Sequence, residues 1–347
     1  TRAGQEAYIY ALLREMETVS KNLKKRPVDT VFIGGGTPSV PECDVMEKLL
    51  QGLRDYFLFS ADAEVTIEAN PGTLTPEKLS IYRKYGINRI SIGLQSPNNK
   101  ELAMLGRIHN YAQFLESFQM ARAAGFSNIN VDLMFAIPGQ CYEDWIENLR
   151  MVAALGPEHI SAYSLIIEEG TPFFRKKLDL PDEDTEYRMY EDVAAVLKEY
   201  DYHQYEISNY AKAGYECRHN EGYWQRKDYL GLGLGAASLL GMERFSNTAD
   251  MQEYLKNSSA PEKIRKNREL LTREDEMAEF MFLGLRMTQG VSKKEFQEYF
   301  GTAIENIYGE VLKKYKKQGL LLEESGRIFL SREGIHVSNA VMAEFLL

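Results

Sequence analysis

Over roughly the first 207 residues, segments with the apolar spacing of a helix alternate with short apolar runs typical of buried strands. Apolar residues three or four apart over 5–24 predict an amphipathic helix, and the β-favouring run at 31–33 predicts a buried strand. The same alternation then continues. The predicted strands are 31–33, 64–69, 89–94, 129–135, 160–166 and 204–207, and the helices between them lie at about 45–53, 76–86, 110–125, 145–155 and 186–199.

This alternation predicts an α/β fold in which a parallel sheet is covered by helices. Five strand–helix units suggest a partial (β/α)6 barrel similar to a TIM barrel, whose first strand is missing here and expected upstream of Thr1. A doubly wound open sheet is the competing architecture.

The pattern changes after residue 210. Residues 211–260 are rich in Gly, Asn and aromatic side chains and are predicted to be irregular, packed on the barrel as a second segment. Residues 261–347 are predicted to form a small helical domain with helices at 275–286, 293–299 and 304–318, followed by a hairpin of 320–322 and 328–330. Helices followed by a hairpin resemble a winged helix, but the mixed local charge favours a structural or docking role over DNA binding.

Composition narrows the class of protein. The 347 residues carry a net charge of −10, which argues against a general nucleic-acid or membrane-surface binder, although peripheral membrane contact stays open. No apolar run is long enough to span a bilayer. Three well-separated cysteines, Cys43, Cys141 and Cys217, form no CxxC pair, so a reducing cytoplasm is the expected compartment.

Polar residues gather where the predicted strands end. Gly34 to Thr37 follow the strand at 31–33, and glycines there let bare backbone approach a ligand, without the Lys of a P-loop. Glu68, Gln95 and Asp132 end or lie within later strands, and Arg107 follows Gln95 after a short helix. Carboxylates can accept hydrogen bonds from an amine or ribose, and the guanidinium can bind a carboxylate. This inventory suits an amino acid joined to a nucleoside, unless Glu68 and Asp132 instead cap helices or pair with arginines.

A second group is the run His219-Asn220-Glu221-Gly222-Tyr223-Trp224. Its histidine could ligate heme iron while the aromatic rings cover the porphyrin, but the residues alone favour an ordinary aromatic packing cluster. Cys217 is a weak candidate for a soft metal ligand. Residues 231–236 fit G-x-G-x-x-A without the preceding strand of a dinucleotide site, so we expect a glycine loop at the barrel mouth.

Six motifs in the same order resemble one family, from about Gln5 to the C-terminus. They are Gly34-Gly35-Gly36-Thr37-Pro38-Ser39, Glu68-Ala69-Asn70-Pro71, Arg89 to Ser96, Leu105-Gly106-Arg107-Ile108-His109, Asp132 with Ile137-Pro138-Gly139-Gln140, and Tyr163 with Glu168-Glu169-Gly170-Thr171. The chain resembles the HemN/HemW branch of radical S-adenosylmethionine proteins, which comprises oxygen-independent coproporphyrinogen III oxidases and heme chaperones.

The resemblance implies a role for each matched residue. S-adenosylmethionine would be bound by Gly35, Gly36, Thr37, Glu68, Gln95, Arg107 and Asp132, with Ile166 and Ala237 packing on its adenine. The run at 219–224 matches the HNxxYW signature of the HemW type, so the resemblance assigns heme to His219, Asn220, Tyr223 and Trp224.

The resemblance also implies a [4Fe–4S] cluster held by a CxxxCxxC loop. That loop is not in this chain and is expected upstream of Thr1. Two functions follow. The first is a heme chaperone that passes heme to an acceptor protein, and the second is a coproporphyrinogen oxidase that decarboxylates porphyrinogen propionates by radical chemistry.

Overall fold

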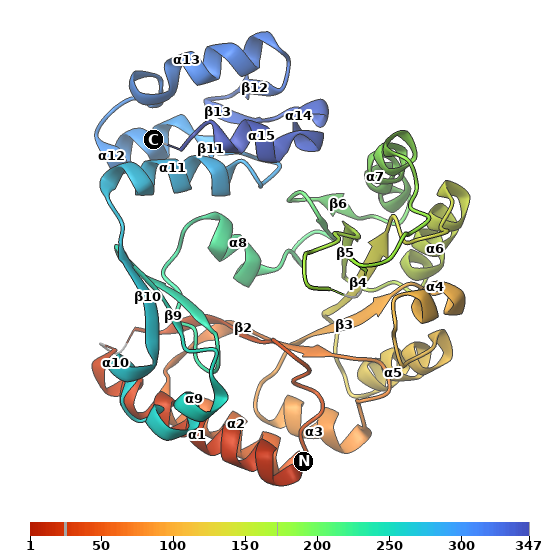
Figure 1. Cartoon of the computed structure of the whole chain (residues 1–347), viewed down its shortest axis with the longest axis vertical. Helices are drawn as coiled ribbons and strands as arrows, with labels where there is room; N and C mark the ends of the chain where they lie inside the picture. Colours follow the sequence, from red (N-terminus) through yellow and green to blue (C-terminus); the bar gives the residue numbers. More distant parts are fainter. Residues whose placement is uncertain (24–25, 172, 347) are drawn as a thin grey trace. The chain divides into compact units, whose positions relative to one another are not determined.

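The N-terminal two thirds of the chain alternate strands and helices in the computed structural model, which describes residues 1–23, 26–171 and 173–346 (Figure 1). The elements in order are α1 (Arg2–Asn22), β1 (Val28–Ile33), α2 (Cys43–Tyr56), β2 (Phe59–Ala69), α3 (Pro76–Lys84), β3 (Arg89–Gln95), α4 (Asn99–Met104), α5 (Tyr111–Ala123), β4 (Ile129–Phe135), α6 (Tyr142–Ala154), β5 (His159–Ser164), α7 (Glu183–Lys198), β6 (His203–Gln204) and β7 (Asn209–Ala211). These elements confirm the strands and helices expected over this part of the sequence, except for the strand expected at 204–207.

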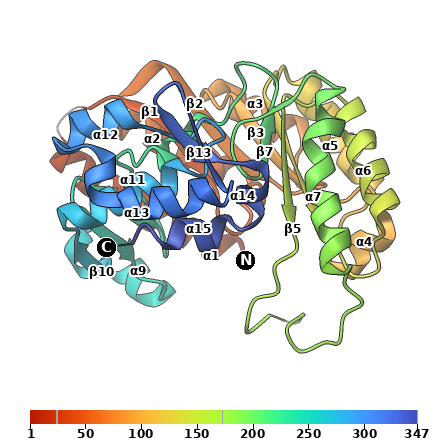
Figure 2. The same cartoon turned by 90° about the horizontal axis from the view of Figure 1, so that it is seen from above.

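The strands form one curled, seven-stranded half-barrel in the order β1-β2-β3-β4-β5-β7-β6. Neighbours from β2 to β5 are parallel, and their order follows the chain without the reversal of a doubly wound sheet. Helices α5, α6 and α7 lie along the outer face of β3 to β5 (Figures 1 and 2). The predicted partial barrel is therefore confirmed.

Local sequence signals account for the helix starts. Thr75 caps α3 by accepting a hydrogen bond from the Lys78 backbone N–H, and Pro76 occupies the first helical position. Asn110 and Gln113 form a capping box at the start of α5.

The single strand expected at 204–207 is wrong. Two short strands occur instead, and β7 runs antiparallel to both β5 and β6. The chain turns between Gln204 and Asn209, where Glu206 accepts hydrogen bonds from the Ser208 backbone N–H and the Asn209 side chain. This turn, which is held by side-chain hydrogen bonds, separates two short strands that the sequence pattern had suggested were one.

Residues 211–260 are more regular than expected. They contain α8 (Arg218–Trp224), β8 (Ala237–Leu240), β9 (Glu243–Asn247) and α9 (Met251–Asn257), followed by α10 (Pro261–Ile264) and β10 (Arg265–Leu270). Strands β10, β9 and β8 form an antiparallel sheet, so the expectation of an irregular segment was wrong. Strand β10, which follows residue 261, was not expected either. Charged residues conceal these strands, because Arg268 of β10 pairs across the sheet with Glu243 of β9.

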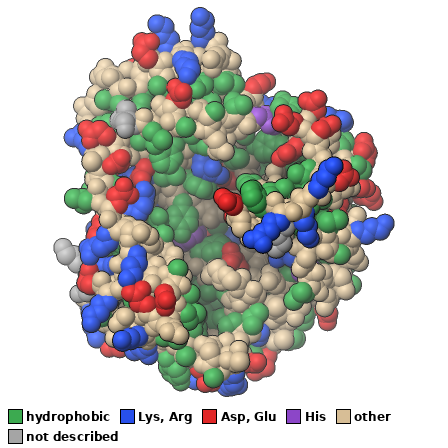
Figure 3. Space-filling model, in the orientation of Figure 1, with side chains coloured by type: hydrophobic (Ala, Val, Ile, Leu, Met, Phe, Trp, Pro, Cys, Tyr) green, Lys and Arg blue, Asp and Glu red, His purple; other side chains and the backbone are tan. Residues whose placement is uncertain are grey.

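The C-terminal part has the predicted helices and hairpin. Its elements are α11 (Arg273–Gly284), β11 (Val291–Ser292), α12 (Lys293–Phe300), α13 (Ile304–Lys317), β12 (Leu321–Glu324), β13 (Arg327–Leu330), α14 (Arg332–His336) and α15 (Ser338–Ala343). Its core is aromatic, with Phe296 in contact with Phe280, Phe300 and Tyr308. Lys293 pairs with Glu305 and Glu323, and in Figure 3 basic and acidic side chains are interspersed over the visible face of the described residues.

Contacts divide the chain into two compact units. One comprises residues 1–29, 41–63 and 217–347, and the other comprises 30–40 and 64–216. The functional boundaries expected at 210 and 260 stay a prediction. In the part of the chain that the structure describes, no helix combines the length and apolar character needed to cross a membrane.

Candidate functional site

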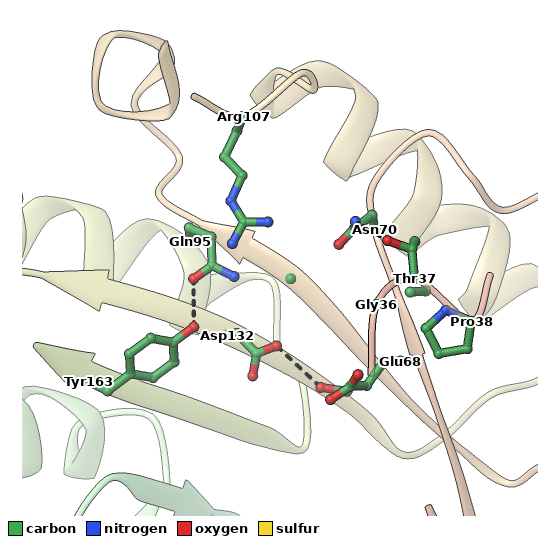
Figure 4. A pocket seen from close by; sticks show the side chains of 12 residues that line it. Gly36, Thr37, Pro38, Glu68, Asn70, Gln95, Arg107, Asp132 and Tyr163 are labelled. Atoms are coloured by element: carbon green, nitrogen blue, oxygen red, sulfur yellow. Dashed lines mark hydrogen bonds between the residues drawn. The ribbon is translucent and has the colours of Figure 1, made fainter. Parts of the chain in front are cut away.

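The carboxyl ends of β1 to β5 surround a cavity of about 240 Å³ within the unit 30–40 and 64–216 (Figure 4). Most of the residues expected from the sequence to bind S-adenosylmethionine come together here. The lining includes Gly36, Thr37, Glu68, Gln95, Arg107 and Asp132. Parallel strands bring these side chains to one edge although they are spread over 97 positions from Gly36 to Asp132.

The glycine loop after β1 is fitted closely to Glu68. The Gly35 backbone N–H donates to Glu68 Oε2 at 3.0 Å, and a Cβ at Gly34 would lie 2.9 Å from the same oxygen. Gly36, in contrast, has open space on its Cβ side. Lys78 Nζ of α3 donates to the backbone oxygens of Ser39 at 2.7 Å and Thr73 at 3.2 Å, which holds the far end of the loop in place.

Gln95 ends β3 in a left-handed conformation, with a φ of 75°. This conformation is uncommon for a residue with a side chain, and it coincides with an irregularity in the register of β3 against β4. Tyr163 O–H donates to Gln95 Oε1 at 2.7 Å, so the amide nitrogen is turned toward the cavity (Figure 4). Tyr163 was not expected to line the site. The available signal was its position on β5, two residues after Ser161 on the same face.

Two carboxylates give the cavity its electrostatic character. Burial raises the pKa of Glu68, and the nearby negative charge of Asp132 raises it further, whereas the Gly35 N–H opposes the shift. Burial also raises the pKa of Asp132, although Asn130 Nδ2 donates to its Oδ1 at 2.7 Å and Ser91 Oγ donates to its Oδ2 at 3.3 Å. Neither carboxylate caps the following helix, because Thr75 and Cys141 do so.

Arg107 provides the positive charge at this edge. It follows α4 and points toward the cavity from the side opposite Glu68 (Figure 4). Among the residues that the structure describes, no carboxylate forms an ion pair with it. The cavity therefore offers acceptors for an amine or hydroxyl groups and a guanidinium for a carboxylate.

The other predicted residues lie elsewhere. Ile166 is in the loop after β5 and 76 % exposed, and Ala237 begins β8 in the other compact unit. The run at 219–224 forms most of α8. His219 Nε2 lies 3.1 Å from the Tyr223 hydroxyl, and Tyr223 also meets Tyr229 edge to face. Trp224 lies under the guanidinium of Arg286, 4.3 Å from the ring centroid.

Comparisons with known proteins agree with this geometry. The model of the radical SAM superfamily matches residues 3–152, and the HemN C-terminal domain matches 271–337. The heme chaperone HemW of Bacillus subtilis is 36 % identical over 346 residues, covering 98 % of this chain and 91 % of the relative. The HemW of Escherichia coli is 35 % identical over 337 residues, covering 93 % and 88 %. The chain belongs to the HemW family of radical SAM proteins.

A solved structure supports the fold of this HemW-family protein. The coproporphyrinogen III oxidase HemN of Escherichia coli, described as a radical SAM enzyme, superposes with a TM-score of 0.87 at 23 % identity and covers all of this chain and 84 % of its own. The sequence resemblance to the HemN/HemW branch is confirmed. At this identity the HemN structure shows a shared fold and no more.

The residues of this chain fit one of the two cofactors of radical SAM proteins, S-adenosylmethionine, but not the other, the [4Fe–4S] cluster. The acceptors Glu68 and Asp132, the guanidinium of Arg107 and the open side of Gly36 fit the charged and hydroxyl groups of S-adenosylmethionine. In the described ranges, no three His, Cys, Asp or Glu side chains are grouped to hold a metal. Cys43 and Cys141 start different helices and Cys217 is buried, so these cysteines do not form the ligand set of a [4Fe–4S] cluster.

Proposed function

We propose that this HemW-family protein is a heme chaperone, which binds heme and delivers it to an acceptor protein. The observation that carries the proposal is the HNxxYW run on α8 in a chain that matches curated heme chaperones over nearly its full length. A cytoplasmic location, the absence of nucleic-acid partners and possible peripheral membrane contact stay predictions.

The proposed heme ligand is His219. Its Nε2 shares a hydrogen bond with the Tyr223 hydroxyl, so binding iron through Nε2 exchanges this bond for a metal bond. Tyr223 is 36 % exposed, and its hydroxyl then becomes available to a propionate or to water. Asn220 and Trp224 complete the proposed heme-contacting set on the same short helix.

The cavity at the strand ends is the proposed site of S-adenosylmethionine. We assign the glycine loop and Glu68 to the amino group, Arg107 to the carboxylate, and Gln95 and Asp132 to the ribose, because these pairings match each donor with an acceptor. The bound cofactor supplies a sulfonium centre, and the residues of this chain bind and orient it. The full proposed set is Gly35, Gly36, Thr37, Glu68, Gln95, Arg107 and Asp132, with Ile166 and Ala237 for the adenine.

Heme titration of the full chain tests the chaperone proposal. Wild-type protein should give a saturable Soret band, and His219→Ala should lose it. His203→Ala is the matched control, because His203 is also a partly exposed histidine, paired with Glu216 at 2.9 Å and outside α8. Equal heme binding by the wild type and His219→Ala would overturn the assignment of His219.

The alternative is an oxygen-independent coproporphyrinogen III oxidase. It rests on the strand-end cavity, since the likeness to HemN shows the fold alone. An anaerobic assay decides between the two, with protein that carries the expected CxxxCxxC loop and a reconstituted cluster. Turnover of coproporphyrinogen III would favour the oxidase. Heme binding without turnover of coproporphyrinogen III would favour the chaperone.

A further inference from the structure

Three buried side chains continue the floor of the cavity into the interior of the half-barrel. Asn130 Nδ2 lies 2.7 Å from Asp132 Oδ1, and Asn130 Oδ1 lies 2.6 Å from His159 Nδ1. His159 Nε2 lies 2.8 Å from the hydroxyl of Tyr205. Asn130, His159 and Tyr205 are 2 %, 0 % and 5 % exposed, so water does not compete for these hydrogen bonds.

The direction of each hydrogen bond follows from Asp132. An ionised carboxylate only accepts, so Asn130 must present its amide nitrogen to Asp132 and its oxygen to His159. Nδ1 of His159 therefore carries a proton. Burial and the positive charge of Arg89 keep the pKa of His159 well below its usual range, so the ring is neutral and Nε2 has no proton. Tyr205 must then donate to Nε2, and every bond of the chain points toward Asp132.

We propose that His159 and Tyr205 are positioning residues, which act through Asn130 to hold Asp132 as an acceptor for ligand hydroxyls. The inference rests on the proposed cofactor site. Without the Nδ1–H of His159, the Asn130 amide can turn and place its oxygen against Asp132, which repels the carboxylate that should face the ribose. Ser161 Oγ is a second donor to Asn130 Oδ1 at 3.2 Å, so loss of His159 should weaken the arrangement without abolishing it.

Two further contacts explain why the orientation of Asn130 matters. Its amide also donates to Ser91 Oγ at 2.8 Å, and Ser91 in turn donates to Asp132 Oδ2. One amide therefore orients both oxygens of Asp132, one directly and one through Ser91. Three charged or titratable groups surround this carboxylate from neighbouring strands, namely Glu68 of β2, Arg89 of β3 and Tyr163 of β5.

Ring ¹⁵N NMR tests the chain of hydrogen bonds without any ligand. In protein labelled at histidine, His159 should be neutral at pH 7 with its proton on Nδ1, and Tyr205→Phe should change the shift of Nε2 most. A ring protonated on Nε2, or a charged ring, would overturn the inference. His159→Leu identifies the resonance.

Binding of S-adenosylhomocysteine to the full chain tests the consequence. It carries the same ribose, and calorimetry gives its affinity. His159→Leu should bind about tenfold more weakly, the effect of about one hydrogen bond, whereas His159→Asn keeps an N–H near the place of Nδ1 and should recover most of the affinity. Equal binding by the wild type and His159→Leu would overturn the inference. No binding by the wild type would instead overturn the proposed cofactor site.

If His159→Leu does not fold, two tyrosine variants test the same inference by S-adenosylhomocysteine binding. Tyr205→Phe deletes one buried hydroxyl of the chain and should weaken binding. Tyr202→Phe deletes another buried hydroxyl in the same unit, which donates to the Pro157 backbone oxygen, and should leave binding unchanged. Equal affinities for these two variants would contradict a positioning role for Tyr205.

Discussion

A largely buried ionic cluster adjoins the C-terminal end of helix α8. None of the residues of α8 is fully buried. The cluster comprises Arg226, just after α8, with Arg244 of β9 and with Glu276 and Glu279 of α11. Arg226 Nε and Arg244 Nη2 approach Glu279 at 2.7 and 2.6 Å, and Arg226 Nη1 approaches Glu276 at 2.9 Å. We therefore expect the proposed heme helix to depend on Glu279.

The perturbation is Glu279→Gln, which keeps the shape and one acceptor oxygen but removes the charge. Hydrogen bonds to charged groups contribute about 1.5–3 kcal/mol each, and Glu279 accepts two. The Arg226 side chain is 9 % exposed, so its lost bond counts fully, whereas that of Arg244 is 37 % exposed and can regain water. Arg226 also keeps Glu276. The expected local loss is about 3 kcal/mol, or about 100-fold in the opening of α8.

Hydrogen exchange measured by mass spectrometry reports this opening directly. Amides over 218–226 should exchange about 100-fold faster in Glu279→Gln, whereas those of β3 and β4 should not change. Glu344→Gln is the control, because Glu344 pairs with Lys314 on the surface. Unchanged exchange in α8, or a uniform increase over the whole chain, would refute the reasoning. Heme affinity should fall with the protection of α8.

Three further predictions follow from single positions. Gly34→Ala places a Cβ 2.9 Å from Glu68 Oε2 and should weaken S-adenosylhomocysteine binding at least about tenfold in a calorimetric titration, with an unchanged melting temperature as the check on folding. Burial raises the pKa of Glu101, so its native carboxyl stays protonated to higher pH than the unfolded one. In urea titrations the free energy of unfolding of Glu101→Gln relative to the wild type should therefore rise as the pH increases above the ordinary pKa of a glutamate, about 4.3, and a flat difference would contradict this. Gly290→Ala puts a Cβ 2.0 Å from the Ile328 backbone oxygen at a φ of 61°, so it should lower the free energy of unfolding by at least about 2 kcal/mol; a loss below about 0.5 kcal/mol would be inconsistent with the close approach.

The parallel part of the fold was predictable because its signals are local. The strand expected at 129–135 has the bounds of β4, and Asn110 begins α5 as its capping box indicates. The sheet of β8, β9 and β10 was missed because its charged residues are satisfied only across strands, as Arg268 is by Glu243. Such pairing has no periodic signature in one sequence.

The position of the candidate site at the carboxyl ends of the parallel strands was also predictable from the sequence. Parallel strands ensured that Glu68, Gln95 and Asp132 would meet at one edge, which sequence order alone indicates. The support beneath them was not predictable. His159 gave no signal at the start of its strand, because its partners Asn130 and Tyr205 lie 29 and 46 positions away in the chain.

The polar interior of the half-barrel also selects how its strands align during folding. Asn130 and Asp132 face inward, while the alternate residues Val131 and Leu133 are fully buried on the opposite face. A slip of one residue in β4 would exchange these two sets and leave an amide and a carboxylate against apolar helices, at a cost of about 1–3 kcal/mol for each unsatisfied group. A half-barrel with an entirely apolar interior would tolerate such a shift in register more readily. The polar lining therefore favours the native register of these strands over registers shifted by one residue.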